Sequence, residues 1–252
     1  MYWSGFLLTA FYLFVCFFSS ENLYAQTDYK TARVKCRESS SGTTYSNKQC
    51  TPDYGLSGSS EILTHFAYRG LSYSGTQPSL ISSFLYNFGS QFKLGAWGAN
   101  LNLADSNLWL KYVMEIQMKF AEQHDVTLFI HRDQFYANGD RNGVEVGLNY
   151  YFLERFYLGL SNKDNFEATH SSSQYLAFAH TIPINKVFNF AYKIGYTNQQ
   201  STTYTNYMDA KISVAYDLKN STFEFGVTDM TAKDTYVQKA EPHFYGSLLA
   251  YY

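Results

Sequence analysis

The sequence predicts an all-β protein, a transmembrane antiparallel up-and-down β-barrel of about twelve strands with short periplasmic turns and long extracellular loops. Three observations predict it. Apolar and polar residues alternate from about Ile62 to the end, long and short polar connections alternate between these runs, and aromatic residues gather beside the short connections. A period of two is typical of strands with two different faces, and a membrane barrel is apolar outside and polar inside.

The chain begins with an apolar run, Phe6–Phe18, followed by small and polar residues up to Ala25. This arrangement predicts a cleaved signal peptide at residues 1–25, and a retained membrane anchor is the alternative. Export through such a signal places the protein in a compartment where disulfides form.

Residues 26–58 are polar and rich in Ser and Gly, which predicts a periplasmic N-terminal extension. Cys36 and Cys50 flank a Ser/Gly/Thr-rich stretch in it, so we expect them to form a disulfide. The barrel itself is expected at residues 59–252.

Within the barrel, the clearest strand is 108–121, where apolar residues occupy the even positions and Lys111, Glu115 and Lys119 lie among the odd ones. A helix with this pattern would bury lysines, so a strand is the better interpretation. The predicted strands are 61–69, 80–88, 92–101, 108–121, 126–132, 143–152, 156–161, 174–182, 188–197, 208–217, 222–228 and 243–252.

Aromatic residues lie at the strand ends next to the short connections, where they would form a girdle at one membrane interface. They are Phe88, Phe92, Phe120, Phe152, Phe156, Phe188, Tyr216 and Phe223. The last strand places Phe244, Leu248 and Tyr252 on the lipid face, and such a terminal strand predicts recognition by the barrel assembly machinery.

Two segments resemble a known family. Tyr68-Arg69-Gly70-Leu71-Ser72, followed by Gln77-Pro78-Ser79, is similar to the first hairpin of the TorF-type porins of proteobacterial outer membranes. Lys93-Leu94-Gly95-Ala96-Trp97-Gly98-Ala99-Asn100-Leu101 resembles the second signature of that family. The resemblance covers about residues 60–252. It implies an outer-membrane channel and names no substrate.

Following the alternation inward predicts which side chains line the lumen. They are Arg69, Lys93, Trp97, Lys111, Glu115, Lys119, Glu145, Lys193, Asp209, Lys211 and Glu224. These charges either line a water-filled pore or pair into a network that fills a closed barrel. Trp97 could stack on a solute or pack as filler. Because cations outnumber anions in this set, an open lumen is expected to prefer anions weakly.

No catalytic motif, metal-binding pattern or cofactor-binding pattern stands out, and a net charge of −2 argues against a nucleic-acid binder. Ser247 near His243 is a conceivable start for a membrane-embedded lipid hydrolase, with only proximity in its favour. We therefore expect a non-enzymatic channel for passive diffusion of small polar solutes or ions in the outer membrane of a Gram-negative bacterium. Its other expected partners are outer-membrane lipid and lipopolysaccharide. The alternative is a non-conducting structural or adhesive barrel that acts through its loops.

Overall fold

The computed structural model describes residues 54–252 except 76, 90, 121–122, 138, 154, 202–203, 219–220, 232–241 and 252. The expected signal peptide, the Cys36–Cys50 disulfide, most of the N-terminal extension and the assembly residue Tyr252 lie outside the described residues. These remain predictions.

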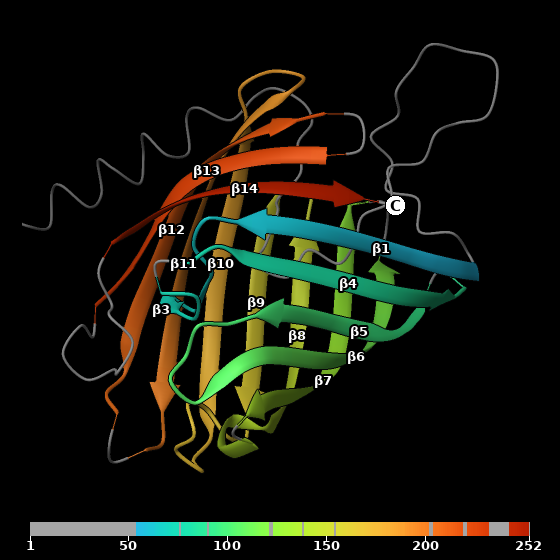
Figure 1. Ribbon diagram of the computed structural model, residues 1–252. Coiled ribbons are helices and arrows are strands. Elements are labelled where there is room, and N and C mark those ends of the chain that lie inside the picture. Colours follow the sequence, from blue (N-terminus) through green and yellow to red (C-terminus); the bar gives the residue numbers. More distant parts are fainter. Residues whose placement is uncertain are drawn as a thin grey trace, which may run out of the picture.

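In this part of the chain, twelve antiparallel strands close into a barrel, which confirms the predicted fold class (Figure 1). The strands are β1 (Tyr54–Leu63), β4 (Ser79–Phe88), β5 (Phe92–Asn100), β6 (Ser106–Phe120), β7 (His124–Ala137), β8 (Gly143–Phe152), β9 (Phe156–Lys163), β10 (Ser173–Pro183), β11 (Phe188–Gln199), β12 (Tyr207–Asp217), β13 (Ser221–Met230) and β14 (His243–Tyr251). Each strand pairs with its neighbour in chain order, and β1 pairs with β14, with Ser59 opposite Tyr251, to close the sheet.

The barrel wall has an apolar outer face and a more polar inner face. On β4, Phe84 and Tyr86 are exposed on the outside, whereas Ser83, Leu85 and Asn87 are buried on the inside. Other exposed outer residues are Leu94, Met114, Ile130, Leu160, Leu176, Ile194, Ile212, Phe225, Phe244 and Leu248. Strands with this alternation bury polar groups in the lumen and present hydrocarbon to their surroundings, as a lipid-facing barrel requires.

The connections at the two ends of the barrel differ in length, as predicted. Short links cover 89–91, 121–123, 153–155, 184–187 and 218–220, and the other end carries the longer segments. The predicted girdle residues lie beside the short links, where several of them pack in pairs. The centroids of Phe88 and Phe92 are 5.6 Å apart, and those of Phe188 and Tyr216 are 4.9 Å apart. No helix among the described residues is long and apolar enough to cross a membrane.

The first strand differs from the prediction of 61–69. It begins at Tyr54 and ends at Leu63, so the barrel starts inside the segment that we expected to be periplasmic extension. The small residues of this strand hid it from pattern analysis, because Gly58 and Ser60 alternate with Ser57 and Ser59 and give little contrast between the two faces. The serine hydroxyls are used in the barrel wall, and Ser59 Oγ lies 2.9 Å from Ser83 Oγ on β4.

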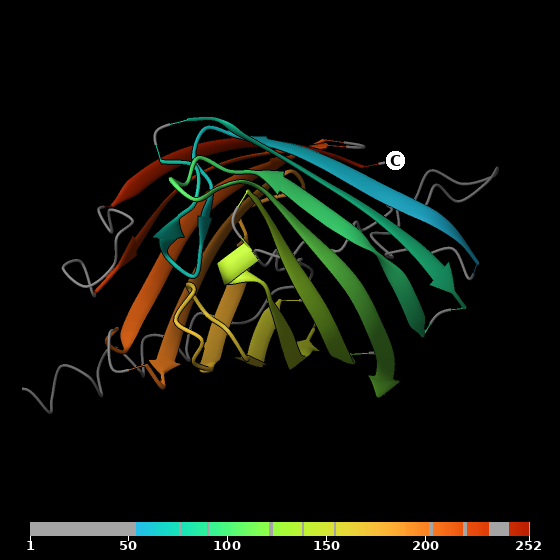
Figure 2. The same cartoon turned by 60° about the horizontal axis from the view of Figure 1, so that its bottom comes forward.

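The segment that follows β1, residues 64–78, folds into the barrel, and we call it the inner hairpin. It contains two short paired strands, β2 (Ala67–Tyr68) and β3 (Leu71–Ser72) (Figure 2). Arg69 and Gly70 form the turn with φ values of 50° and 77°, as in the two-residue turns that need positive φ at both positions. A Cβ atom on Gly70 would lie 2.7 Å from the Asp209 Cβ atom, so the turn touches the β12 wall.

Candidate functional site in the barrel lumen

Aromatic side chains of the inner hairpin fill one side of the lumen. Tyr68 and Tyr73 pack against Trp109 of β6, with ring centroids 5.1 Å and 5.4 Å from it. Trp109 stacks in turn on Phe135 of β7 at 4.9 Å. The same buried cluster includes Phe66, Leu71, Ala99, Leu101, Phe166, Tyr207 and Met230. The hairpin is therefore held on this side by burial of large apolar surfaces.

Arg69, at the tip of the inner hairpin, binds the opposite wall. Its Nη2 atom lies 2.7 Å from Glu145 Oε1 on β8 and donates to Ser161 Oγ on β9 at 2.9 Å. Its guanidinium carbon lies 4.4 Å from the ring centroid of Tyr175 on β10. The side chains of Arg69 and Glu145 are 1% and 4% exposed. A buried charge needs partners of this kind, and here they connect the hairpin to three strands.

Arg69 and Glu145 belong to a larger charge cluster, which also contains Lys111, Asp133 and Lys163. Lys111 Nζ lies 3.5 Å from Asp133 Oδ1 and 3.4 Å from Glu145 Oε2, and Lys163 Nζ lies 2.6 Å from Asp133 Oδ2. Tyr68 donates its hydroxyl to Glu145, and Trp109 donates Nε1 to Asp133. Every member of the cluster is buried next to an opposite charge.

A second group of contacts holds the hairpin at its long-loop side. The short 3₁₀ helix η1 (Gly139–Arg141) places Arg141 between two other loops. Arg141 pairs with Asp105, at 2.9 Å, and with Glu167. Glu167 also accepts a hydrogen bond from the hydroxyl of Tyr73 in the hairpin. Burial and the neighbouring Glu167 raise the pKa of Tyr73 well above its usual value, which keeps this hydroxyl a neutral donor.

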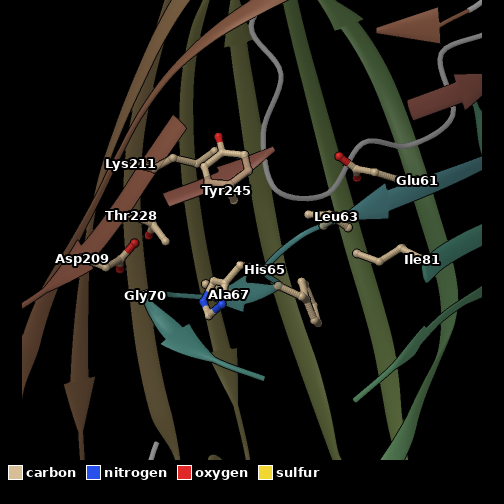
Figure 3. Close-up of a pocket in the computed structure, with 11 residues that line it drawn as sticks. Glu61, Leu63, His65, Ala67, Gly70, Ile81, Asp209, Lys211, Thr228 and Tyr245 are labelled. Atoms are coloured by element: carbon tan, nitrogen blue, oxygen red, sulfur yellow. The ribbon is translucent and has the colours of Figure 1, made fainter. Parts of the chain in front are cut away.

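On the other side of the hairpin a space remains, which we call the recess. Its volume is about 600 Å³ including the part open to solvent, and it lies between the hairpin, β1 and the β12–β14 wall (Figure 3). Charged and polar side chains reach it from both sides. They are Glu61 of β1, His65 of the hairpin, Asp209 and Lys211 of β12, Thr228 of β13 and Tyr245 of β14.

The cation of the recess lies beside a carboxylate. Lys211 Nζ is 3.1 Å from Glu224 Oε1 on β13 and 4.8 Å from the ring centroid of Tyr245. Tyr245 donates its hydroxyl to the same Glu224 oxygen at 2.5 Å. The Lys211 side chain is 22% exposed, in contrast to the enclosed cations of the charge cluster.

Two histidines lie at the long-loop side of the recess. The rings of His65 and His243 stack with centroids 4.0 Å apart, and His65 Nδ1 lies 2.6 Å from the carbonyl oxygen of Gly75. Burial, followed by the neighbouring His243, lowers the pKa of His65 below its ordinary value of 6.5.

The structure separates the residues that were predicted to line a pore. Arg69, Lys111 and Glu145 are enclosed in the charge cluster. Of the two arrangements considered from the sequence, these residues therefore form a paired charge network and do not line a water-filled pore. Trp97 packs with its ring centroid 5.0 Å from that of Trp109, in contact with the aromatic cluster, as filler does. Lys111 and Glu145 do not line an open passage because the inner hairpin, with Arg69 at its tip, occupies the space in front of them.

The other predicted lining residues are not members of the charge cluster. Asp209 and Lys211 line the recess, and Glu224 is adjacent to it. Lys93 is buried on β5 opposite Glu115, whose Oε1 atom is 3.5 Å from His131 Nε2. Lys193 lies with Nζ 5.3 Å from the ring centroid of Tyr175, and Lys119 is exposed near the short-link end of β6.

Three important lumen residues were missed in the sequence. Asp133 and Lys163 were assigned to loops because the predicted strands stopped at residues 132 and 161, whereas β7 continues to Ala137 and β9 to Lys163. The odd-position pattern does continue through Asp133 to Phe135, and it could have extended β7. Glu61 was placed at the start of a strand without an assigned face.

The fold is shared with known porins. The KdgM porin superposes with a TM-score of 0.52 at 10% identity, over 78% of this chain and 98% of the porin. A structure of KdgM porin in complex with disordered oligogalacturonate gives a TM-score of 0.52 at 12% identity, over 77% of this chain and 98% of the porin. The NanC porin gives a TM-score of 0.52 at 11% identity, over 79% and 100%. At such identities the likeness shows the fold alone.

Sequence comparison gives the family. Among curated proteins, none matches this sequence significantly. The TorF-type name suggested by the two motifs is not confirmed, although the porin fold that it implied is present. One family profile matches residues 47–246, which cover most of the chain and nearly the whole barrel. The chain therefore belongs to the family described as "Bacterial protein of unknown function (Gcw_chp)".

Proposed function

We propose that the protein is an outer-membrane channel for passive diffusion of small polar solutes or ions, and that its path runs through the recess. The recess carries this proposal, because it is a space in the lumen with charged and polar lining residues, beside an inner hairpin whose aromatic side chains pack against β6 and β7. A hydrated path lined by Asp209, Lys211 and Thr228 lowers the cost of moving a polar solute past an apolar wall.

Location in the outer membrane is supported by the outer wall and by the porin fold. Exposed apolar side chains lie outside and buried charges inside, and a charge on the lipid face would cost about 2–4 kcal/mol at the bilayer midplane. The partners we propose are outer-membrane lipid and lipopolysaccharide, the barrel assembly machinery and the solute itself. The porin neighbours are channels, which supports a non-enzymatic function.

The inner hairpin limits the size of the solute. It reaches from β1 across to Glu145 on β8 and to Asp209 on β12, so the full cross-section of the barrel is not available at this level. We therefore expect passage of ions and small molecules and exclusion of bulky oligomers. The same hairpin favours the competing function, a non-conducting structural barrel, if the recess does not continue to both ends.

Recording from planar bilayers tests the proposal. Purified protein should be shown to be folded by a shift in gel migration between unheated and heated samples, and then added to the bilayer. We expect discrete conductance steps that are small compared with those of an open twelve-stranded barrel. Folded protein that produces no steps at any voltage would establish the non-conducting alternative.

A further inference from the structure

We infer that the recess selects cations over anions, and that Glu61 and Asp209 are its selectivity residues. The inference rests on the proposed function, since selectivity requires conduction. It concerns the sign of the charge of the ion that passes through the channel, which the porin fold does not determine.

The first step is that the lumen cations next to the inner hairpin are committed to partners outside the recess. Arg69, Lys111 and Lys163 are buried in the charge cluster, each within 3.5 Å of Asp133 or Glu145. Lys111 and Lys163 lie against Tyr68 of the hairpin, and Arg69, although part of the hairpin, directs its side chain to Glu145 on β8. Their field at the recess is reduced by those two carboxylates, so they contribute little to the selection of a passing ion.

The second step is the charge of the recess lining. Glu61 and Asp209 belong to β1 and β12, strands that are not neighbours, and Figure 3 shows their carboxylates on opposite sides of the recess. Among the described lining residues the cationic side chain is that of Lys211, and its ammonium lies beside Glu224. Carboxylates therefore outnumber the cation along the passage, and a ring of fixed negative charge favours cations.

The remaining titratable groups do not reverse this sign. The lowered pKa of His65 leaves its ring neutral at pH 7, and the Tyr245 hydroxyl is occupied by Glu224. Lys193 is opposite Lys211 in the strand register, and its ammonium lies against Tyr175, whose hydroxyl donates to Asp209 at 3.1 Å. The charge of this second cation is offset by Glu224, which lies beside Lys211.

This sign is opposite to the weak anion preference expected from the sequence. That expectation counted Arg69 and Lys111 as pore cations and did not include Glu61. Folding of the inner hairpin removes the two cations from the passage, and the β1 register adds the carboxylate. The inference also argues against transfer of acidic sugar ligands from the KdgM complex to this chain, since a polyanion would meet like charge.

The test is a reversal potential measured in bilayers with a KCl gradient, using the full-length protein. One excess unit charge about 5 Å from an ion in water, screened at physiological salt, raises the occupancy of K⁺ about two-fold and lowers that of Cl⁻ about two-fold. We therefore expect K⁺ to be favoured over Cl⁻ by about three- to five-fold. The double variant Glu61→Gln with Asp209→Asn should bring the ratio to unity or below. The control Asp125→Asn, at the short-link end of β7, should keep the native ratio.

Each outcome separates the two proposals. A native protein that conducts with no preference or prefers Cl⁻ overturns the inference and leaves the channel function intact. A native preference for K⁺ that survives both neutralising changes also overturns it, because the selecting charge then lies elsewhere. If the double variant does not fold, the single variant Lys211→Gln provides the opposite test, and it should increase the preference for K⁺.

Discussion

Arg69 is the residue whose removal should open the barrel most. In Arg69→Met, the hairpin keeps an apolar side chain of similar length but loses the contact to Glu145 at 2.7 Å and the hydrogen bond to Ser161 at 2.9 Å. The side chain is 1% exposed, so water cannot replace these partners in place. Breaking one side of a buried ion pair costs about 3–5 kcal/mol.

The lower end of that range applies here, because Lys111 stays 3.4 Å from Glu145 and compensates part of its charge. A cost of about 3 kcal/mol shifts the equilibrium between docked and released hairpin by more than 100-fold toward release. The aromatic cluster still holds the hairpin, so we expect it to open intermittently. Single-channel recording should show larger conductance steps than the native protein, with frequent transitions to the native level.

Two further variants test whether the ion pair between Arg69 and Glu145 controls the opening of the hairpin. Glu145→Gln removes the same ion pair from the wall side and should produce the same large steps. Arg132→Met removes an exposed arginine from the outer face of β7 and should conduct like the native protein. If Arg69→Met and Glu145→Gln fold and their conductance equals that of the native protein, the hairpin does not control the passage and our reasoning is wrong.

Two other predictions concern pH and the lipid face. The pKa of His65 is below 6.5 when the inner hairpin is docked, so the docked hairpin binds fewer protons than the released one. The stability of the docked hairpin is therefore intact above pH 6.5 and falls as pH decreases through that value. Conductance should therefore rise below about pH 6, and His65→Asn should abolish the rise; an unchanged pH profile in that variant would contradict the role of His65. Ile212→Lys, in the apolar outer face of β12, should cost about 2–4 kcal/mol and reduce the folded fraction in membranes, whereas Gln174→Lys, at the long-loop end of β10, should not. Equal folded fractions of these two lysine variants, measured by migration of unheated samples, would show that Ile212 does not face lipid.

The barrel could be predicted from the sequence because its signal is local. Strand β6 alternates over its whole length, so Lys111 and Glu115 were assigned to the lumen from residue order alone. Of the closing pair, β14 was predicted and β1 was not placed correctly. The Ser and Gly residues of β1 give too little contrast between its two faces to mark a strand.

The inner hairpin could not be predicted, because its position depends on contacts distant in the sequence. Phe66 and Tyr68 alternate with Ala67 and Arg69 as in a barrel strand, and this pattern does not say which sheet the residues join. Their partners are Trp109 and Glu145, on β6 and β8, and no local pattern connects them. As a result many of the inward charges were identified, without Glu61, Asp133 and Lys163, while their division into an enclosed cluster and an accessible recess was not.

The central claim is that the passage lies in the recess and not on the side of the charge cluster. It is tested most directly by cysteine modification during bilayer recording. Thr228 lines the recess, and Ser161 accepts a hydrogen bond from Arg69 of the charge cluster. Both are inward-facing hydroxyl residues with 7% exposure. A negatively charged thiol reagent should change the current through Thr228→Cys and leave Ser161→Cys and the native protein unaffected. Modification that changes the current through Ser161→Cys and not through Thr228→Cys would contradict the account.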